Sequence, residues 1–409
     1  MADEGQPISV DEDVYFRSPS GFFAQLRETR PVAAVQIPGQ GRRWVVTRYE
    51  DVRAGLADPQ LSKDLHHWPT GPRTWPSQAV NLHAHMLHRD PPDHTRLRGL
   101  MLKAFTPRRI AQLRPRTVEI AETLLADMAS AGGEIVDLLI RFARPLPITV
   151  LSELLGVPAA DRAWLEVAVV DYDNGKDRER VIRELAVYFT DLITAKRAEP
   201  GDDLVSALVR VRDESDAALT DIELLSGVFQ LVMAGFDTTV NLIASGTLAL
   251  LTHPEQAARL REEPSLLPAA VEELLRHTNP LNHATERFTL TDVVIGGVTI
   301  PAGEWVLLAT SSANGDPGRF PAPERLDFNR QPGGHVSFGH GIHYCLGAPL
   351  ARLEAQVAFG ALLTRFPKLS LAATPEDLRW RPVSLMHGLE ALPVRPHGPS
   401  RPTLPLRQR

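Results

Sequence analysis

The segment that most limits how this chain can fold is the apolar run "VFQLVMAGFDTTVNLIASGTLALL" at residues 228–251. A helix of this length that is apolar on every side belongs either in a membrane or in a large buried core. Asp237 lies near the middle of the run, and a carboxylate there costs roughly 2.5–3.5 kcal/mol on insertion into a bilayer. We therefore expect a buried core helix that runs from about Asp221, as its N-cap, to His253, just before Pro254.

Composition excludes several classes of protein. The chain has 409 residues, of which 43% are hydrophobic and 23% charged, an ordinary balance for a protein with a large core. Its net charge of −6 argues against general nucleic-acid binding, which usually needs a basic surface. The single cysteine excludes an intrachain disulfide, and the acidic N-terminus does not resemble a signal peptide. We expect a cytoplasmic protein that binds neither nucleic acid nor a membrane.

Hydrophobic spacing predicts a mainly α protein with a small β region. Strand-like patterns occur at 43–49 and within 292–310, where Gly296–Gly297 would form a tight turn. Helical spacing or helix-start signals occur at residues 92–105, 114–131, 145–155, 178–197, 266–278 and 348–366.

The only cysteine, Cys345, lies in "FGHGIHYCLG" at residues 338–347, just before the last predicted helix. Pro349 suits the first turn of that helix. The unpaired N–H groups and the dipole at the helix start would then face the sulfur and favour the thiolate. The glycines of this loop would let a flat ligand lie against the backbone.

Four interpretations of Cys345 stay open at this point. It could be an inert buried cysteine, a nucleophile paired with a distant histidine, as in a cysteine hydrolase, or a thiolate ligand to haem iron. It could also bind zinc with His335, His340 and His343, although this spacing matches no closed zinc pattern.

The loop as a whole resembles the haem-binding loop of the cytochrome P-450 superfamily, the haem-thiolate monooxygenases. Six positions carry the resemblance: Phe338, Gly339, Gly341, His343, Cys345 and Gly347. The resemblance implies that Cys345 is the axial ligand of haem b iron. It also implies one haem domain over residues 14–395, with haem between the Asp-Thr helix and the helix after the cysteine loop. Residues 1–13 and 396–409 would be flexible tails.

A second stretch, "AGFDTT" at residues 234–239, resembles the oxygen-activation segment of the same family. By this resemblance Ala234 and Gly235 leave room for O2 beside the iron. Thr238 would hydrogen-bond the bound oxygen and Asp237 would help to relay protons to it, because cleavage of the O–O bond consumes two protons.

The pair Glu273 and Arg276 has the spacing E-x-x-R. The spacing alone is weak, because Glu50/Arg53 and Glu376/Arg379 share it, and most such pairs are surface contacts worth roughly 0.2–0.5 kcal/mol. In the family such a pair is buried and supports the haem-binding loop, and by the same resemblance Arg330 completes it.

Haem carries two propionates, so the resemblance also implies cations around them. His94 and Arg98 share one face of the helix in "DPPDHTRLRGL", whereas Arg96 lies off that face. Arg287 and His343 fall at further positions that match the family.

The implied reaction inserts one atom of O2 into an organic substrate, by hydroxylation or epoxidation. The chain has no G-x-G-x-x-G motif for a flavin or nicotinamide, so electrons would pass from NAD(P)H through a ferredoxin reductase and a ferredoxin. A basic face of Arg98, Lys103, Arg108, Arg109 and Arg352 would suit an acidic partner of a monomeric enzyme. Oxidative coupling and a non-catalytic haem protein remain alternatives.

The resemblance to members that tailor macrolides and other secondary metabolites implies a small, apolar substrate. The segments that the family folds over the haem supply its candidate contacts: Trp68, Trp75, His83, Leu231, Asn282, His283, Leu385 and Met386.

Overall fold

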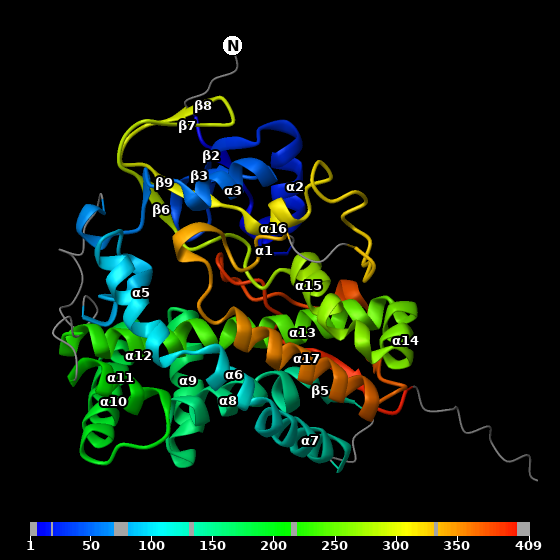
Figure 1. Ribbon diagram of the computed structural model, residues 1–409. Helices are drawn as coiled ribbons and strands as arrows, with labels where there is room; N and C mark the ends of the chain where they lie inside the picture. Colours follow the sequence, from blue (N-terminus) through cyan, green and yellow to red (C-terminus); the bar gives the residue numbers. More distant parts are fainter. Residues whose placement is uncertain are drawn as a thin grey trace, which may run out of the picture.

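The structure is a computed structural model that describes residues 6–17, 19–68, 81–130, 135–213, 219–330 and 334–398. Figure 1 shows a β-rich part with the N-terminal helices at one end and a larger helical part at the other. The predicted mainly α class with a small β region is confirmed.

The N-terminal helices are α1 (Glu12–Arg17), α2 (Pro19–Thr29) and α3 (Tyr49–Ala57). The helical part contains α5 (Asp93–Ala104), α6 (Pro107–Gln112), α7 (Arg114–Ser130), α8 (Pro145–Leu155), α9 (Arg162–Asp173), α10 (Arg178–Ala198), α11 (Leu204–Asp213), α12 (Asp221–Gly235), α13 (Asp237–Thr252), α14 (Pro254–Glu262), α15 (Leu267–Thr278) and α17 (Ala348–Arg365). Helix α16 (Thr310–Asn314) instead lies beside α2 and α3. The predicted helices thus lie within a few residues of their expected bounds.

The largest sheet has the strand order β1-β2-β3-β9-β6-β4. Its strands are β1 (Ile8–Ser9), β2 (Val32–Ile37), β3 (Gly41–Val46), β9 (Trp305–Leu308), β6 (Arg287–Thr289) and β4 (Leu61–Ser62). The pairs β1–β2 and β3–β9 are parallel, and the other neighbours are antiparallel. A smaller sheet joins β5 (Val136–Asp137), β11 (Pro393–Arg395) and β10 (Ser370–Leu371). A hairpin joins β7 (Val293–Ile295) to β8 (Val298–Ile300), and the predicted turn residues Gly296 and Gly297 both have positive φ.

The apolar run at residues 228–251 is a core element, as predicted, but it is not one helix. Most of the segment Asp221–Thr252 is buried inside the protein, and α12 and α13 meet at Phe236, whose φ/ψ of −86°/−75° interrupts the regular ladder. The N-cap is Thr220 rather than Asp221. Thr220 accepts a hydrogen bond from the N–H of Glu223 (3.1 Å), and the Glu223 carboxylate accepts one from the N–H of Thr220 (2.8 Å), a capping box.

Helices α13 and α17 pack against each other and against α15 through the protein interior. Gly246 permits this close crossing, because a Cβ there would lie 2.5 Å from the Phe359 ring. Leu350, Leu353 and Val357 on α17 are buried, as its predicted apolar stripe requires. The core therefore fixes where α17 begins, immediately after the cysteine loop.

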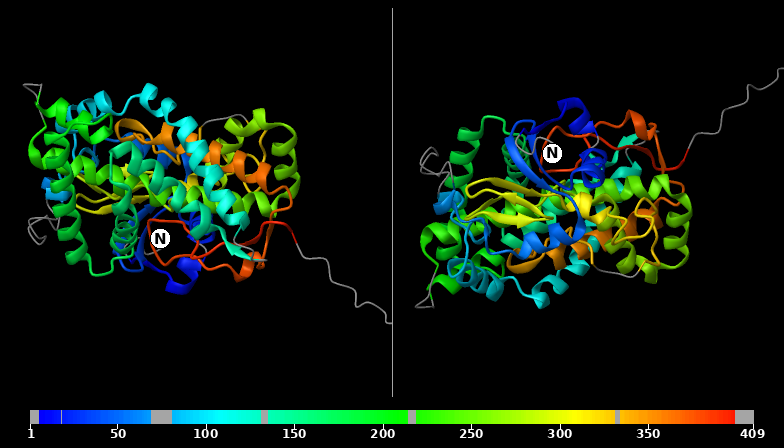
Figure 2. Two further views of the ribbon diagram at one scale, coloured as in Figure 1. Left: turned by 90° about the horizontal axis from the view of Figure 1, so that it is seen from below. Right: turned by 90° about the horizontal axis from the view of Figure 1, so that it is seen from above.

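A segment near the C-terminal end of the chain lies beside the N-terminal helices. In both views of Figure 2 the red C-terminal segment runs beside the blue N-terminal helices, and Tyr15 Oη and Ser384 Oγ lie 3.0 Å apart. Ile8 and Ser9, expected in a flexible tail, instead form β1 and pair with Val35 and Gln36 of β2. That part of the expected tail is ordered because its backbone completes the sheet edge.

Candidate functional site

A cavity lies between α5, the junction of α12 with α13, and the cysteine loop that precedes α17. Most of its lining is apolar, with a few polar and charged side chains at defined places. Elements far apart in the sequence contribute these residues: His94, Arg98, Leu231, Ala234, Thr238 and Cys345.

The cysteine loop is held in a tight conformation that glycine permits. Gly339 and Gly341 have φ of 74°, where a side chain is strained. A Cβ on Gly341 would also lie 3.0 Å from the backbone of Leu56, so α3 packs directly against the loop. The N–H of Cys345 donates to the carbonyl of Phe338 (2.9 Å) and closes the loop. The result is a cradle with the sulfur directed into the cavity.

The Cys345 side chain is exposed toward the cavity, away from bulk water. Burial raises the pKa of its thiol, while the N–H groups of Gly347 and Ala348 and the charges of Arg98 and Arg352 lower it. The sequence predicted that the helix start would favour the thiolate. Those groups act in the predicted direction, but burial outweighs them. A cation at the sulfur would reverse this balance, because metal coordination deprotonates a thiol.

Cations converge on one side of the cavity. The rings of His94 and His343 meet edge to face at 4.4 Å between centroids, and both ring nitrogens of His94 are buried without a hydrogen-bond partner among the described residues. Burial and neighbouring cations lower the pKa of His343, and burial lowers the pKa of Arg287 to about 10. Arg98 donates to the carbonyl of Tyr344 (2.7 Å). An anion here would accept a hydrogen bond from His94 and would offset the charges of Arg98 and Arg287, which lower the pKa of His343.

Sequence reasoning missed one member of this cation cluster, Lys63. Its side chain is buried and donates to Thr285 Oγ1. Burial, then the charge of Arg287, lowers the pKa of Lys63. A single lysine after a short strand usually lies on the surface, so no local pattern distinguishes this one.

The opposite side of the cavity is formed by α12 and α13. Gln230, Ala234 and Thr238 follow one another at helical spacing and all line the cavity. Thr238 Oγ1 donates to the carbonyl of Ala234 (2.8 Å), and such a bond from a helical threonine bends the helix. Gly235 lets α12 approach α8 closely at this point, because a Cβ there would lie 3.3 Å from the Leu151 side chain.

Asp237 faces away from the cavity. It is 1% exposed and accepts a hydrogen bond from Arg381 Nη1 at 2.5 Å, while Arg381 Nη2 donates to Asn174 Oδ1 at 2.9 Å. Burial and the charge of Asp237 raise the pKa of neighbouring Asp173 to about 8. The sequence predicted an acid at this place but gave no sign of Arg381, which lies 144 residues away.

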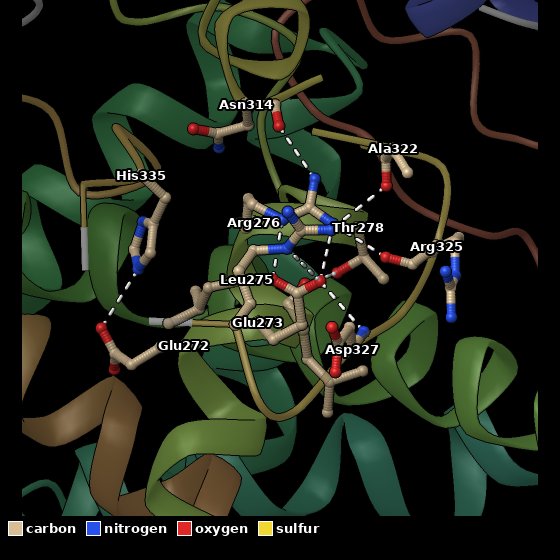
Figure 3. Close-up of polar contacts among 12 residues, drawn as sticks. Glu272, Glu273, Leu275, Arg276, Thr278, Asn314, Ala322, Arg325, Asp327 and His335 are labelled. Carbon is tan, nitrogen blue, oxygen red and sulfur yellow. Dashed lines mark hydrogen bonds and ion pairs between the residues drawn. The ribbon is translucent and has the colours of Figure 1, made fainter. Parts of the chain in front are cut away.

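The Glu273–Arg276 pair is buried, and it connects α15 to the cysteine loop. Arg276 makes two 2.7 Å hydrogen bonds to the Glu273 carboxylate and one of 2.9 Å to the carbonyl of Asn314, as Figure 3 shows. Arg330 Nε lies 3.2 Å from Glu273 Oε1, as the resemblance implied.

The connection continues through the side chain of Asn314. Its Oδ1 accepts from the N–H of Val336 and its Nδ2 donates to Ser337 Oγ, both at 2.8 Å. Ser337 Oγ in turn donates to the carbonyl of Leu275 at 2.8 Å. The residues just before the cysteine loop are thus tied to Arg276 through Asn314 and to the backbone of α15 at Leu275.

Comparisons with known proteins agree with this geometry. The cytochrome P-450 family model matches residues 172–385. The chain is 47% identical to the cytochrome P-450 monooxygenase PikC of Streptomyces venezuelae, over 96% of this chain and 92% of PikC. It is 45% identical to 6-deoxyerythronolide B hydroxylase of Saccharopolyspora erythraea, over 92% and 95% of the two chains. The solved structure of tirandamycin C-bound P-450 monooxygenase TamI superposes with a TM-score of 0.87, with 46% identity, covering 95% of this chain and 100% of TamI.

The chain belongs to the cytochrome P-450 family. Within this family it is a monooxygenase that uses haem, O2 and electrons from redox partners. The cavity of this cytochrome P-450 fits that cofactor. Cys345, which offers a sulfur ligand, lines the same mostly apolar space as Arg98, Arg287 and His94, and both ring nitrogens of His94 are buried without a hydrogen-bond partner among the described residues.

The zinc interpretation of the cysteine loop is not supported by this cytochrome P-450 structure. Among the described residues, His335, His340, His343 and Cys345 do not come together as a group that could hold a metal ion. His335 instead contacts the carboxylate of Glu272 at 3.1 Å.

The predicted substrate residues are only partly brought together. Leu231 lines the cavity. His83 contacts Tyr172 Oη at 3.0 Å, behind the cavity wall. Trp68 packs edge to face on Trp305 and does not line the cavity. Trp75 lies outside the described residues.

In the segment around residues 281–285 and in the Leu385–Met386 turn, the predicted contact residues point away from the cavity. Asn282 and His283 do not line the cavity, nor do Leu385 and Met386. Asn282 Nδ2 donates to the carbonyl of Met386 at 3.3 Å, and its N–H donates to the carbonyl of Leu385 at 2.9 Å. The cavity is lined there by other residues: Pro280, Leu281, Ala284 and Thr285. Sequence position identified the segment, but it could not tell which residues face inward.

The predicted basic face is also narrower than expected. Arg352 binds the Glu272 carboxylate at 2.6 Å, and Arg109 lies 3.4 Å from an exposed aspartate. Lys103 and Arg108 are exposed, and within the described parts of the chain neither forms an ion pair. These two residues carry the exposed charge of the face without an ion pair, whereas Arg98 lines the cavity.

Proposed function

We propose that this cytochrome P-450 hydroxylates or epoxidises a largely apolar macrolide or related polyketide. The observation that carries the proposal is the single cavity that contains Cys345, the cation cluster and Thr238 within a mainly apolar lining. Relatives named for comparable chemistry support it, among them 6-deoxyerythronolide B hydroxylase.

Haem b would be held in this cavity by Cys345, whose sulfur would bind the iron, and by the loop of Phe338, Gly339 and Gly347, which lines the same space. Its propionates would lie among His94, Arg98, Arg287 and His343, with Lys63 as an added cation. The pKa values of the histidines and of Arg287 are lowered, so a propionate would restore the charge that burial disfavours. Bound haem supplies the activation of O2 that protein side chains cannot provide.

The groups beside Thr238 would govern protons. Thr238 Oγ1 faces the cavity beside Ala234 and Gly235, and in the resting state it donates to a helix carbonyl. The Thr238 hydroxyl would break its hydrogen bond to the Ala234 carbonyl and donate to O2 instead. Asp237 would deliver protons from behind, after it exchanges its bond to Arg381 for one to water. The buried carboxyl of Asp173, with its pKa of about 8, would hold a proton next to this route.

Gln230 would provide the polar contact for the substrate. It lines the cavity one helical turn before Ala234, and its Oε1 is buried without a hydrogen-bond partner among the described residues. A hydroxyl on the substrate would satisfy it, whereas an entirely apolar ligand would leave it unpaired at a cost of roughly 1–3 kcal/mol.

Electrons would come from an acidic ferredoxin, reduced by its reductase with NAD(P)H. The docking surface would be formed by Lys103 and Arg108 with the exposed side chains of Leu102, Ile342 and Tyr344, close to the cysteine loop. We further propose a cytoplasmic monomer in which residues 14–395 form one haem domain.

The experiment is a spectral titration of the purified, haem-loaded protein with a panel of macrolactones and polyketides, followed by turnover with a ferredoxin and reductase. The proposal expects a shift of the haem spectrum on binding and a product heavier by one oxygen atom. Loss of two hydrogen atoms without oxygen gain would instead indicate oxidative coupling. Binding of peptides or steroids in preference to every polyketide would contradict the proposed substrate class.

A further inference from the structure

Three histidines outside the haem cavity form a separate cluster. His83, His85 and His88 lie in the short sequence "HAHMLH", at residues 83–88. One ring nitrogen from each lies within 4.8 Å of those of the other two. None of the three has a part in holding haem, and sequence reasoning assigned only His83, to substrate contact.

The three histidine rings pack against one another in the protein interior. His85 and His88 are stacked with centroids 4.7 Å apart, and His83 lies 5.3 Å from His88. His83 and His85 are buried and His88 is partly buried. The Nδ1 atoms of His85 and His88 are buried without a hydrogen-bond partner in the part of the chain that the structure describes. Buried nitrogens of this kind require a partner.

The cluster also has the outer contacts that orient metal ligands. Tyr172 Oη lies 3.0 Å from His83 Nε2. The Phe229 ring lies edge to face on His83 at 5.6 Å. A hydrogen bond to the far nitrogen of a histidine fixes its tautomer and raises its strength as a ligand.

We propose that His83, His85 and His88 form a zinc site with three imidazole ligands and an open fourth position. Zn–N bonds of about 2.0–2.1 Å in a tetrahedral site place ligand nitrogens roughly 3.3 Å apart. The rings would therefore close by at most ~1.5 Å, which rotation about their side-chain bonds can supply. Neutral imidazoles suit zinc, whereas hard oxygen-seeking cations would find no carboxylate among the three ligands.

Positive charge near the three histidines lowers their expected affinity for zinc. Lys63 and Arg89 are close enough to disfavour positive charge on His85. Arg89 is partly neutralised by Asp64 at 3.7 Å. The site should therefore bind zinc reversibly, unlike a zinc finger, whose anionic thiolates lock the metal in place.

The position of the site gives zinc a consequence for the haem cavity. Met86 and Leu87 lie between two of the ligands, and both line the cavity. His83 contacts Tyr172 of α9 and Phe229 of α12. Zinc would fix residues 83–88 to one another and, through His83, to both helices, so it would restrain the positions of Met86 and Leu87 in the cavity wall.

The test uses the full-length, haem-loaded protein. A chelator first removes exchangeable metal ions, and zinc chloride is then titrated into the protein in a calorimeter. The parent should bind one equivalent. His88→Asn should weaken binding by more than the roughly 10–100-fold that loss of a ligand's hydrogen-bond partner costs, and His85→Asn should do the same. His66→Asn is the matched control, because His66 is exposed and lies in the neighbouring segment.

Hydrogen exchange separates this site from zinc bound elsewhere. Zinc should slow the exchange of amides in residues 81–88 of the parent and leave the His88→Asn variant unchanged, while equal haem content shows that both are folded. Absence of stoichiometric binding would overturn the proposal. Binding that survives in both His85→Asn and His88→Asn would also overturn it, because the metal would then be held by other groups.

Discussion

Replacing Arg276 tests whether the buried ion pair supports the cysteine loop. Arg276 is 4% exposed and donates to the Glu273 carboxylate twice, at 2.7 Å, and to the carbonyls of Asn314 and Arg325 at 2.9 and 3.3 Å. Arg276→Gln leaves a carboxylate of 5% exposure with only Arg330 and one backbone N–H as partners. Breaking a buried pair from one side costs roughly 3–5 kcal/mol.

This loss of unfolding free energy can be expressed as a drop in melting temperature. An unfolding entropy of about 2.1 cal/mol/K per residue gives about 0.86 kcal/mol/K for 409 residues. The expected drop in Tm is therefore about 3.5–6 °C. Arg276→Lys keeps the charge but cannot form the paired hydrogen bonds, so its Tm should lie between those of the parent and Arg276→Gln.

Circular dichroism melts give the Tm, and transfer of haem to a scavenging apoprotein gives the rate of haem loss. Arg276→Gln should lose haem faster than the parent, because Asn314 holds the start of the cysteine loop. Arg379→Gln is the matched control, since Glu376 and Arg379 share the same spacing but are exposed. Equal Tm and haem loss in Arg276→Gln and Arg379→Gln would refute the reasoning.

Three further changes have defined outcomes. Gln230→Leu should weaken spectral binding of a hydroxylated macrolactone about 5- to 150-fold, from the roughly 1–3 kcal/mol of a lost buried hydrogen bond, and change binding of its deoxy analogue in the opposite sense; equal effects on both would contradict a polar contact. Reversing the charges of Lys103 and Arg108 should slow reduction by ferredoxin and flatten its dependence on salt, whereas a salt response like that of the parent would place the docking surface elsewhere. Asp173→Asn should flatten the pH dependence of stability: burial raises the pKa of Asp173 to about 8, so the folded state keeps a proton that the unfolded state releases near pH 4, and stability falls as pH rises between these values. Parallel Tm curves for the parent and Asp173→Asn between pH 5 and pH 9 would show that this carboxyl does not titrate in that range.

Sequence patterns predicted the elements whose cause is local. Alternation, helical spacing and Gly296–Gly297 are properties of neighbouring residues, so the helices and the β7–β8 hairpin were predictable. The break at Phe236 was not, because the apolar pattern that predicts one long helix continues on both sides of the stretch Asp237–Thr239. It depends on bonds such as that from Thr238 to Ala234 and on the contact of Gly235 with Leu151 of another helix.

The site divides in the same way. The cysteine loop and the Asp-Thr segment were found because each is a short motif, and their convergence on one cavity is present in the structure. The partners Arg381 and Lys63 were missed, since only the tertiary fold brings them to Asp237 and Arg287. For residues 281–285 the segment was right and the inward face was wrong, because irregular backbone has no period from which a direction could be predicted.

The most direct measurement of the central claim is the absorbance of the reduced, carbon monoxide-bound protein before and after Cys345→Ser. With Cys345 as the iron ligand, the parent should show the red-shifted band of thiolate-bound haem. The variant, measured at equal haem content, should lose it. A variant that keeps the same band would contradict the account, because the sulfur at the start of α17 would then not be bound to the iron.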